Sequence, residues 1–143
     1  SHATAGYVDV TGFNLSITPT RSDSKILVQP EVAGGLNDNY GYNFRYRVQR
    51  TVGGVVTSIG IPPTGSYAMT GGYNLYDAAS NTPYIFGMSK TFFDSPATTS
   101  SVNYKIQVSH SHAGSGAIVY VNRRGNSADW TAISTLTLWE VSG

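Results

Sequence analysis

Residues 102–109, which read VNYKIQVS, decide the fold class. Apolar residues occupy every second position, and polar residues lie between them. Successive side chains of a β-strand point to opposite faces, so this pattern predicts a strand with one buried and one hydrated face. Residues 42–49 (YNFRYRVQ) and 13–18 (FNLSIT) alternate in the same way. Residues 133–141 (ISTLTLWEV) are apolar on both sides, which predicts a final strand buried on both faces.

Turn residues separate these alternating runs. Gly53 and Gly54 lie between two valines and predict a two-residue hairpin, because glycine tolerates the positive φ of a type I′ turn. The sequence DSP at 94–96 ends a strand that we expect to span residues 83–93. The spacing of such signals predicts about eight to ten short strands in an antiparallel β-sandwich.

Composition limits the domain count and the class of partner. The chain has 143 residues and a mass of 15.3 kDa, so we expect one domain spanning 1–143. Its first two residues, Ser1 and His2, are typical of what remains after a purification tag is cleaved. A net charge of +1 gives no reason to expect nucleic-acid binding. The absence of cysteine excludes thiol catalysis and disulfides. The sequence has no apolar run of about 18 residues, so we expect no membrane insertion.

The acidic residues do not form a catalytic pattern. Glu31 and Glu140 are the only glutamates, and both lie in strand-like segments. The aspartates are scattered among turn signals, where Asp commonly caps its own backbone. No catalytic motif is present in the sequence, so we expect a protein that is not an enzyme and has no cofactor.

Aromatic residues in loop-like segments are the candidate ligand contacts. Tyr67, Tyr73 and Tyr76 lie in a segment rich in Pro, Gly, Ser and Asn at 61–82, and Trp130 lies in a second one at 122–132. Long loops in small domains are often functional, and tyrosine combines a flat apolar ring with a polar tip. These four residues are therefore predicted to bind ligand. The alternative is that they pack on their own domain or on a neighbouring subunit.

Two arginines share the polar face of the strand predicted at 42–49. Arg45 and Arg47 favour bidentate carboxylate or phosphate partners, and we assign them to a subunit interface, paired with acidic residues of a neighbouring chain. Tyr46, in the core phase of the same strand, is assigned to the interface with them. A phosphate-bearing polysaccharide and a simply hydrated surface are the alternatives.

His110 and His112 form the sharpest metal candidate. Side chains at i and i+2 of a strand point the same way, so three chains meeting on an axis would offer six imidazoles to one ion. Octahedral nitrogen sites of this kind suit iron or nickel. The alternative is a hydrated histidine pair at the end of a strand.

Residues 91–108 (TFFDSPATTSSVNYKIQV) resemble a stretch that recurs in virion proteins of cyanophages and other marine tailed phages. Matching segments follow at 118–123 (IVYVNR) and 134–141 (STLTLWEV). Others precede it at 7–10 (YVDV), 17–20 (ITPT) and 24–28 (SKILV). The resemblance covers most of the chain except a variable middle at about 53–81.

The resemblance implies a C-terminal module of a tail fibre or another virion-surface protein. Such modules are commonly jelly rolls similar to the tumour-necrosis-factor and C1q heads, and they are homotrimers. The implied function is receptor binding at a fibre tip, through a host surface glycan or protein. A capsid-decoration or tail-assembly module that binds other virion proteins is the alternative, and a glycan-processing enzyme is a second one. The resemblance brings no catalytic residues with it.

Overall fold

The computed structural model describes residues 6–37, 43–65, 68–74, 85–110, 118–125 and 129–142. Every regular element in these ranges is a β-strand: β1 (Val8–Ile17), β2 (Lys25–Leu36), β3 (Asn43–Val52), β4 (Val55–Ile59), β5 (Gly71–Asn74), β6 (Ile85–Ser89), β7 (Phe92–Asp94), β8 (Val102–His110), β9 (Val119–Val121) and β10 (Thr135–Val141). The described residues include no helix that is long and apolar enough to span a membrane.

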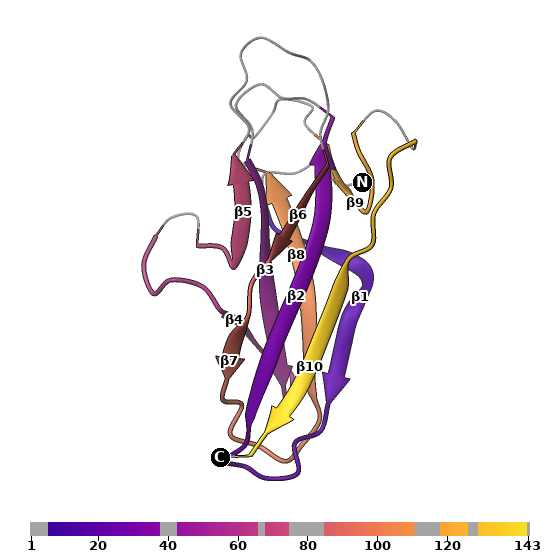
Figure 1. Ribbon diagram of the computed structural model, residues 1–143. Coiled ribbons are helices and arrows are strands. Elements are labelled where there is room, and N and C mark those ends of the chain that lie inside the picture. Colours follow the sequence, from indigo (N-terminus) through magenta and orange to yellow (C-terminus); the bar gives the residue numbers. More distant parts are fainter. Residues whose placement is uncertain are drawn as a thin grey trace.

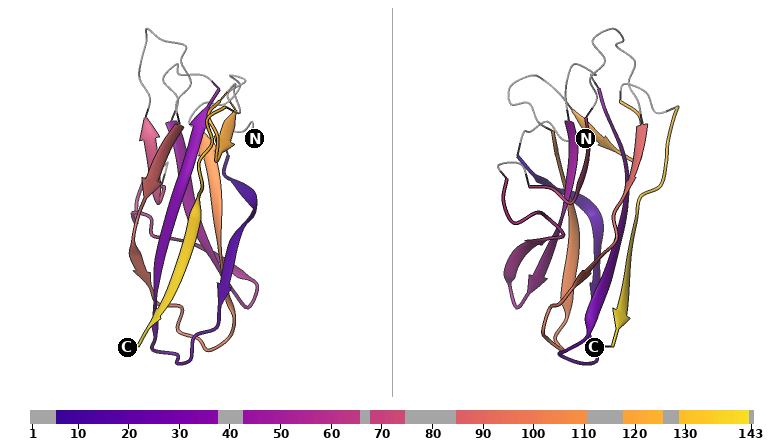
Figure 2. Two further views of the ribbon diagram at one scale, coloured as in Figure 1. Left: turned by 45° about the vertical axis from the view of Figure 1, so that its right-hand side comes forward. Right: turned by 60° about the vertical axis from the view of Figure 1, so that its left-hand side comes forward.

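The strands form two antiparallel sheets that pack face to face (Figures 1 and 2). The β3 sheet has the order β1-β8-β3-β4, and β5 also pairs with β3. The β2 sheet has the order β10-β2-β6, and β7 and β9 also pair with β2. The predicted all-β antiparallel sandwich is confirmed. The finer jelly-roll assignment stays a prediction.

One hydrophobic core fills the space between the two sheets. The inward residues of β8 are Val102, Tyr104, Ile106 and Val108, and all four have 0% exposure. The alternation therefore identifies the inward face correctly, but the opposite face is not hydrated throughout, because Gln107 and Ser109 are 8% and 1% exposed. Across the core, Ile26 and Val28 of β2 are equally buried, which places the central strand of each sheet against the other.

A buried polar cluster joins the two sheets inside this core. Asp94 of β7 accepts a hydrogen bond from the Tyr104 hydroxyl at 2.8 Å, and its other oxygen pairs with Arg50 Nη1 at 2.8 Å. Burial, followed by the bond to Asp94, raises the pKa of Tyr104 above its usual range. The cluster links β7 of the β2 sheet to β3 and β8 of the β3 sheet.

The expected glycine hairpin is present. Gly53 and Gly54 connect β3 to β4 with φ angles of 54° and 83°. Both values lie in the left-handed region that favours glycine. The hairpin prediction is confirmed.

Two expected segments are organised differently. The strand expected at 83–93 is divided into β6 and β7, which both pair with β2. The segment at 61–82 was expected to be a loop, but it contains β5, which pairs with β3. Gly71 and Gly72 lie in that strand, and a Cβ at Gly71 would collide with the Tyr46 ring. Glycine therefore lets β5 pass close to the core, although it is a poor predictor of a strand.

The prediction that the last strand is buried on both faces is wrong. Leu136 and Leu138 of β10 pack against the core. In the opposite phase, Trp139 is 61% exposed and Val141 is 39% exposed. The reason is that the β2 sheet is an outer layer of the sandwich, so only its inner face is covered by the other sheet.

Candidate functional site

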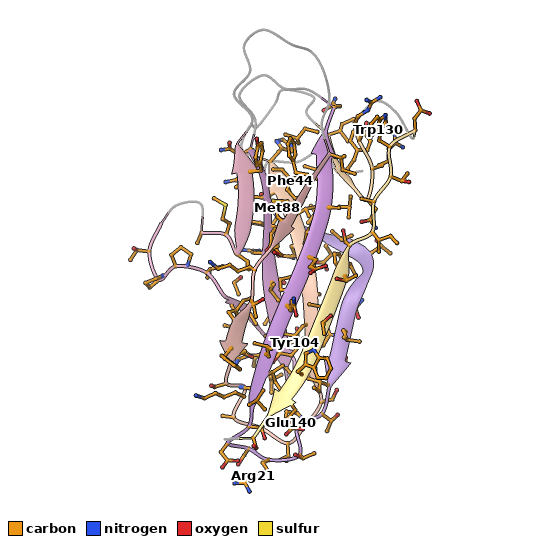
Figure 3. All side chains as sticks on the ribbon, viewed as in Figure 1. Arg21, Phe44, Met88, Tyr104, Trp130 and Glu140 are labelled. Atoms are coloured by element: carbon orange, nitrogen blue, oxygen red, sulfur yellow. The ribbon has the colours of Figure 1, made fainter. Side chains whose placement is uncertain are left out.

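The first candidate surface lies at one end of the sandwich, where β2 ends and β9 begins. Figure 3 shows Trp130 at this end, opposite to Arg21 and Glu140. Trp130 belongs to the connection between β9 and β10 and is 61% exposed. Tyr73 on β5 is 42% exposed. The structure thus leaves both of these predicted contact residues accessible.

Backbone hydrogen bonds fold the connection around Trp130 into a hairpin. The Arg124 amide donates to the Trp130 carbonyl at 3.0 Å, and the Ala132 amide donates to the Asn122 carbonyl at 3.0 Å. Arg123 and Thr131 form an isolated β-bridge between these two bonds. Because Trp130 itself accepts one of these bonds and Ala132 donates the other, the indole is exposed on a hydrogen-bonded backbone.

Two arginines pack on the aromatic rings of this hairpin. The Arg124 guanidinium lies 5.8 Å from the centre of the Trp130 ring, and that of Arg123 lies 4.7 Å from the Tyr120 ring. Each such contact contributes about 0.5–1 kcal/mol at an exposed site. We call these four residues the arginine–aromatic hairpin. They present cationic and aromatic groups side by side, which is the chemistry of many interfaces.

Tyr73 is partly exposed, but its ring also packs against other residues of the domain. It pairs with Phe44 across β3 and β5, and its ring stacks on Phe86 of β6 with a centroid distance of 4.0 Å. The stack closes the gap between the two sheets. A hollow of about 140 Å³ lies beside it, lined in part by Arg45 and Met69. Tyr73 is therefore both a packing residue and a wall of this hollow.

The arginines of β3 are engaged within their own chain. Arg45 is 3% exposed, and its Nη2 donates to the His110 carbonyl at 2.6 Å. Arg47 lies 4.2 Å from the centre of the Tyr7 ring, and its Nε donates to Gln107 at 2.7 Å. The segment before β1 thus covers the part of the β3 sheet that was expected to be a hydrated face.

This arrangement corrects the interface assignment for two residues. Arg45 is buried beneath Tyr7 and its neighbours, and Tyr46 is 0% exposed on the core side of β3. Neither has a side chain that a neighbouring subunit could contact. Arg47 is half-buried, and its assignment to an interface stays a prediction.

Arg47, Gln107 and Asp9 form a polar row across β3, β8 and β1, and Asp9 lies at its end. Its carboxylate accepts hydrogen bonds from Lys105 at 2.8 Å and from Gln107 at 2.5 Å. These bonds lower the pKa of Asp9 below its usual range. This row therefore has an acidic partner within its own chain.

Of the two histidines predicted to bind metal, the structure describes only His110. His110 is 3% exposed and lies opposite Phe44, on the core side of β8. His112, like Tyr67 and Tyr76, lies outside the described residues. Within the described ranges, no three or more metal-ligating side chains gather. Because the His110 imidazole is not presented at the surface, its position lends the metal site no support, and that site stays a prediction.

The second candidate surface is the outer face of the β2 sheet, which our sequence predictions missed. Trp139 of β10 and Phe93 of β7 are 61% and 59% exposed, and both lie opposite Leu27 of β2. Further along this face is a shallow hollow of about 240 Å³, lined in part by Glu31 and Ile133. The alternation at residues 135–141 (TLTLWEV) could have predicted this exposure. Trp139 is at an odd position, whereas the two core leucines are at even ones, so its side chain points to the opposite face.

Comparison with known proteins does not assign the chain to a family. No protein-family model matches the sequence, and no curated protein shows significant similarity to it. The resemblance to virion proteins of marine tailed phages stays a prediction.

Proposed function

We propose that this chain is a recognition domain, without enzymatic activity, on the surface of a phage virion. It forms the tip of a tail fibre and binds a surface glycan or protein of the host. The fibre-tip domain is a jelly roll of the kind that the resemblance implies. The observation that carries the proposal is the arginine–aromatic hairpin, with Trp130 exposed on a hydrogen-bonded backbone.

The chemistry of the hairpin supports recognition. Trp and Arg are over-represented among the few residues that dominate binding energy at interfaces. A side chain that is ordered before binding loses less conformational freedom when the ligand arrives. Both arginines are already placed against aromatic rings, so a host ligand would meet a partly preorganised surface.

Competition with phage adsorption tests the proposal. Marine cyanobacterial cells are first incubated with the purified chain, and the adsorption rate of the phage that carries it is then measured. We expect saturating wild-type chain to slow adsorption about tenfold or more, and Trp130→Ala chain to slow it far less, because one hot-spot side chain contributes about 2 kcal/mol or more.

Other outcomes of this experiment favour the alternatives. Unchanged adsorption, with the chain found over the capsid of intact virions, would favour a decoration or assembly module. Release of sugars from host polysaccharide by the purified chain would contradict the absence of enzymatic activity.

We also propose that the domain is a homotrimer in the virion. The resemblance supports this assembly, and so does the low content of charged residues, 12% of the chain, because subunit faces buried against one another need few charges.

A further inference from the structure

The outer face of the β2 sheet carries one apolar row that crosses three strands. Trp139, Leu27 and Phe93 lie directly opposite one another on β10, β2 and β7. Neighbouring strands are about 4.8 Å apart, so the two aromatic residues are separated by about 10 Å. Leu27 is half-buried between them. The row therefore offers two exposed rings with an aliphatic floor in the middle.

A polar row runs beside the apolar one. Thr137 of β10 lies opposite Gln29 of β2. The pairing of β2 continues in one register from β6 to β7, which places Thr91, exposed, opposite Gln29 as well. On the other side of the apolar row lie Lys25, also exposed, and Val141 opposite it on β10, which is 39% exposed. Hydroxyl and amide groups thus border the aromatic rings on one side, and an ammonium group and an aliphatic side chain border them on the other.

We propose that this face binds an unbranched β-1,4-linked glycan that lies across the strands along the apolar row. The C–H face of a pyranose ring is apolar and stacks on an aromatic ring, while its hydroxyl groups project at the edges. In a β-1,4-linked chain, every second ring presents the same face. The length of that disaccharide repeat is close to the separation of Trp139 and Phe93, so the two rings would stack on alternate sugars.

The bordering polar side chains fit the edges of such a chain. Hydroxyl groups along one edge would meet Thr137, Gln29 and Thr91, and those along the other edge would meet Lys25. This inference rests on the proposed recognition function, but it names the ligand class and a surface other than the arginine–aromatic hairpin.

The size of the row argues against a second copy of the chain as its occupant. With side chains of 150–250 Å², the exposed parts of Trp139 and Phe93 amount to about 250 Å² of apolar surface. A stable protein interface buries about 800 Å² on each partner. Val141 adds only its partly exposed side chain to this area, and the row of Thr137, Gln29 and Thr91 adds polar groups, which a glycan needs beside the apolar ones.

Titration of the wild-type chain with cellohexaose, a linear β-1,4-glucan, tests the inference by calorimetry. We expect saturable binding, a loss of affinity of at least about tenfold in Trp139→Ala and in Phe93→Ala, and partial recovery in Trp139→Phe. Val55→Ala is the control, because that valine is 68% exposed and lies on β4 in the other sheet. It should bind cellohexaose like the wild type. Maltohexaose, whose α-1,4-linked chain curves, should bind far more weakly.

Four outcomes would overturn the inference. These are no binding of cellohexaose, equal binding of maltohexaose, equal affinity of Val55→Ala and Trp139→Ala for cellohexaose, and a wild-type oligomer that dissociates in Trp139→Ala. Each leaves the proposed function standing if the chain still competes with phage adsorption. Conversely, cellohexaose binding that depends on Trp139, without any competition, would contradict the attachment role and keep this site.

Discussion

At the scale of single residues, two fully buried tyrosines differ in what their hydroxyl groups meet. The Tyr104 hydroxyl donates to Asp94 at 2.8 Å. The Tyr46 hydroxyl is buried and has no hydrogen-bond partner among the described residues. Burial raises the pKa of Tyr46 to about 12. An unsatisfied buried hydroxyl costs free energy, whereas a satisfied one contributes to stability.

This contrast predicts opposite effects for the same substitution. Tyr46→Phe removes an unsatisfied group and should raise the free energy of unfolding by about 1 kcal/mol. Tyr104→Phe leaves Asp94 without one of its partners and should lower it by about 1–3 kcal/mol. Chemical denaturation at neutral pH measures both values. Equal effects of the two variants would contradict the different hydrogen bonding of the two hydroxyls.

The pH dependence of the wild type gives a second measurement on Tyr46. Its pKa in the folded chain, about 12, lies above the ordinary value of 10. The unfolded chain therefore loses this proton first as the pH rises. The free energy of unfolding is therefore unaffected by Tyr46 ionisation below pH 10 and falls between about pH 10 and 12, by up to about 3 kcal/mol. This part of the alkaline loss should be absent in Tyr46→Phe.

The arginines of β3 mark the limit of residue-level prediction. Alternation placed Arg45 on the outer face of its strand, where its side chain does lie. It could not predict that Tyr7, distant in the sequence, would pack against that face and leave Arg45 only 3% exposed. Pattern within one strand determines which face a side chain is on, but a contact from elsewhere in the chain determines whether that face is exposed.

At the scale of elements, the arginine–aromatic hairpin is held against the end of β2 by a close backbone approach. A Cβ at Gly125 would collide with the backbone of Leu36 and Asn37. The Asn122 amide also donates to the Ala33 carbonyl at 2.9 Å. Glycine at 125 is therefore needed for the hairpin to lie where it does.

Gly125→Ala should displace the hairpin and lower the free energy of unfolding by about 1–3 kcal/mol, the usual cost of overpacking. Gly87→Ala in β6 is the matched control, because a Cβ at that position has no heavy atom within 4 Å. Its effect should stay within about 0.5 kcal/mol. Denaturation curves compare the two variants with the wild type. A Gly125→Ala chain as stable as Gly87→Ala would contradict the close approach.

Local sequence patterns predicted the strands and turns better than they predicted which faces of those strands are exposed. The alternation at 102–109 and the glycines at 53–54 lie within single local units, and the strand and the hairpin that they predict are confirmed. The pairing of β10 with β2, and the exposed outer face on which Trp139 lies, depend on how distant strands assemble. The apolar composition of residues 133–141 therefore indicated a strand but not its exposure, and the aromatic row on the β2 sheet was missed.

At the scale of the whole molecule, two sheets enclose one core and leave exposed the two surfaces to which we assign recognition. The arginine–aromatic hairpin lies at the end of the sandwich, and the aromatic row lies on its flank. The trimer that we propose would present three copies of each surface to the host, and such multivalency strengthens binding without any new contact.

Light scattering of the purified chain tests the proposed trimer. We expect a mass three times the 15.3 kDa of one chain at micromolar concentration. Closed cyclic symmetry makes the assembly finite, so the mass should not grow as concentration rises. A monomer that persists across this range would contradict the trimer.

Direct binding of the labelled chain to host cells tests the central claim, that the Trp130 end of the sandwich recognises the host. The comparison is between the wild type, Trp130→Ala, and Val55→Ala, which alters a residue with 68% exposure on the β4 hairpin. We predict saturable binding by the wild type and Val55→Ala, and a dissociation constant at least about tenfold higher for Trp130→Ala. Equal binding by all three chains, or no binding by the wild type, would contradict the account.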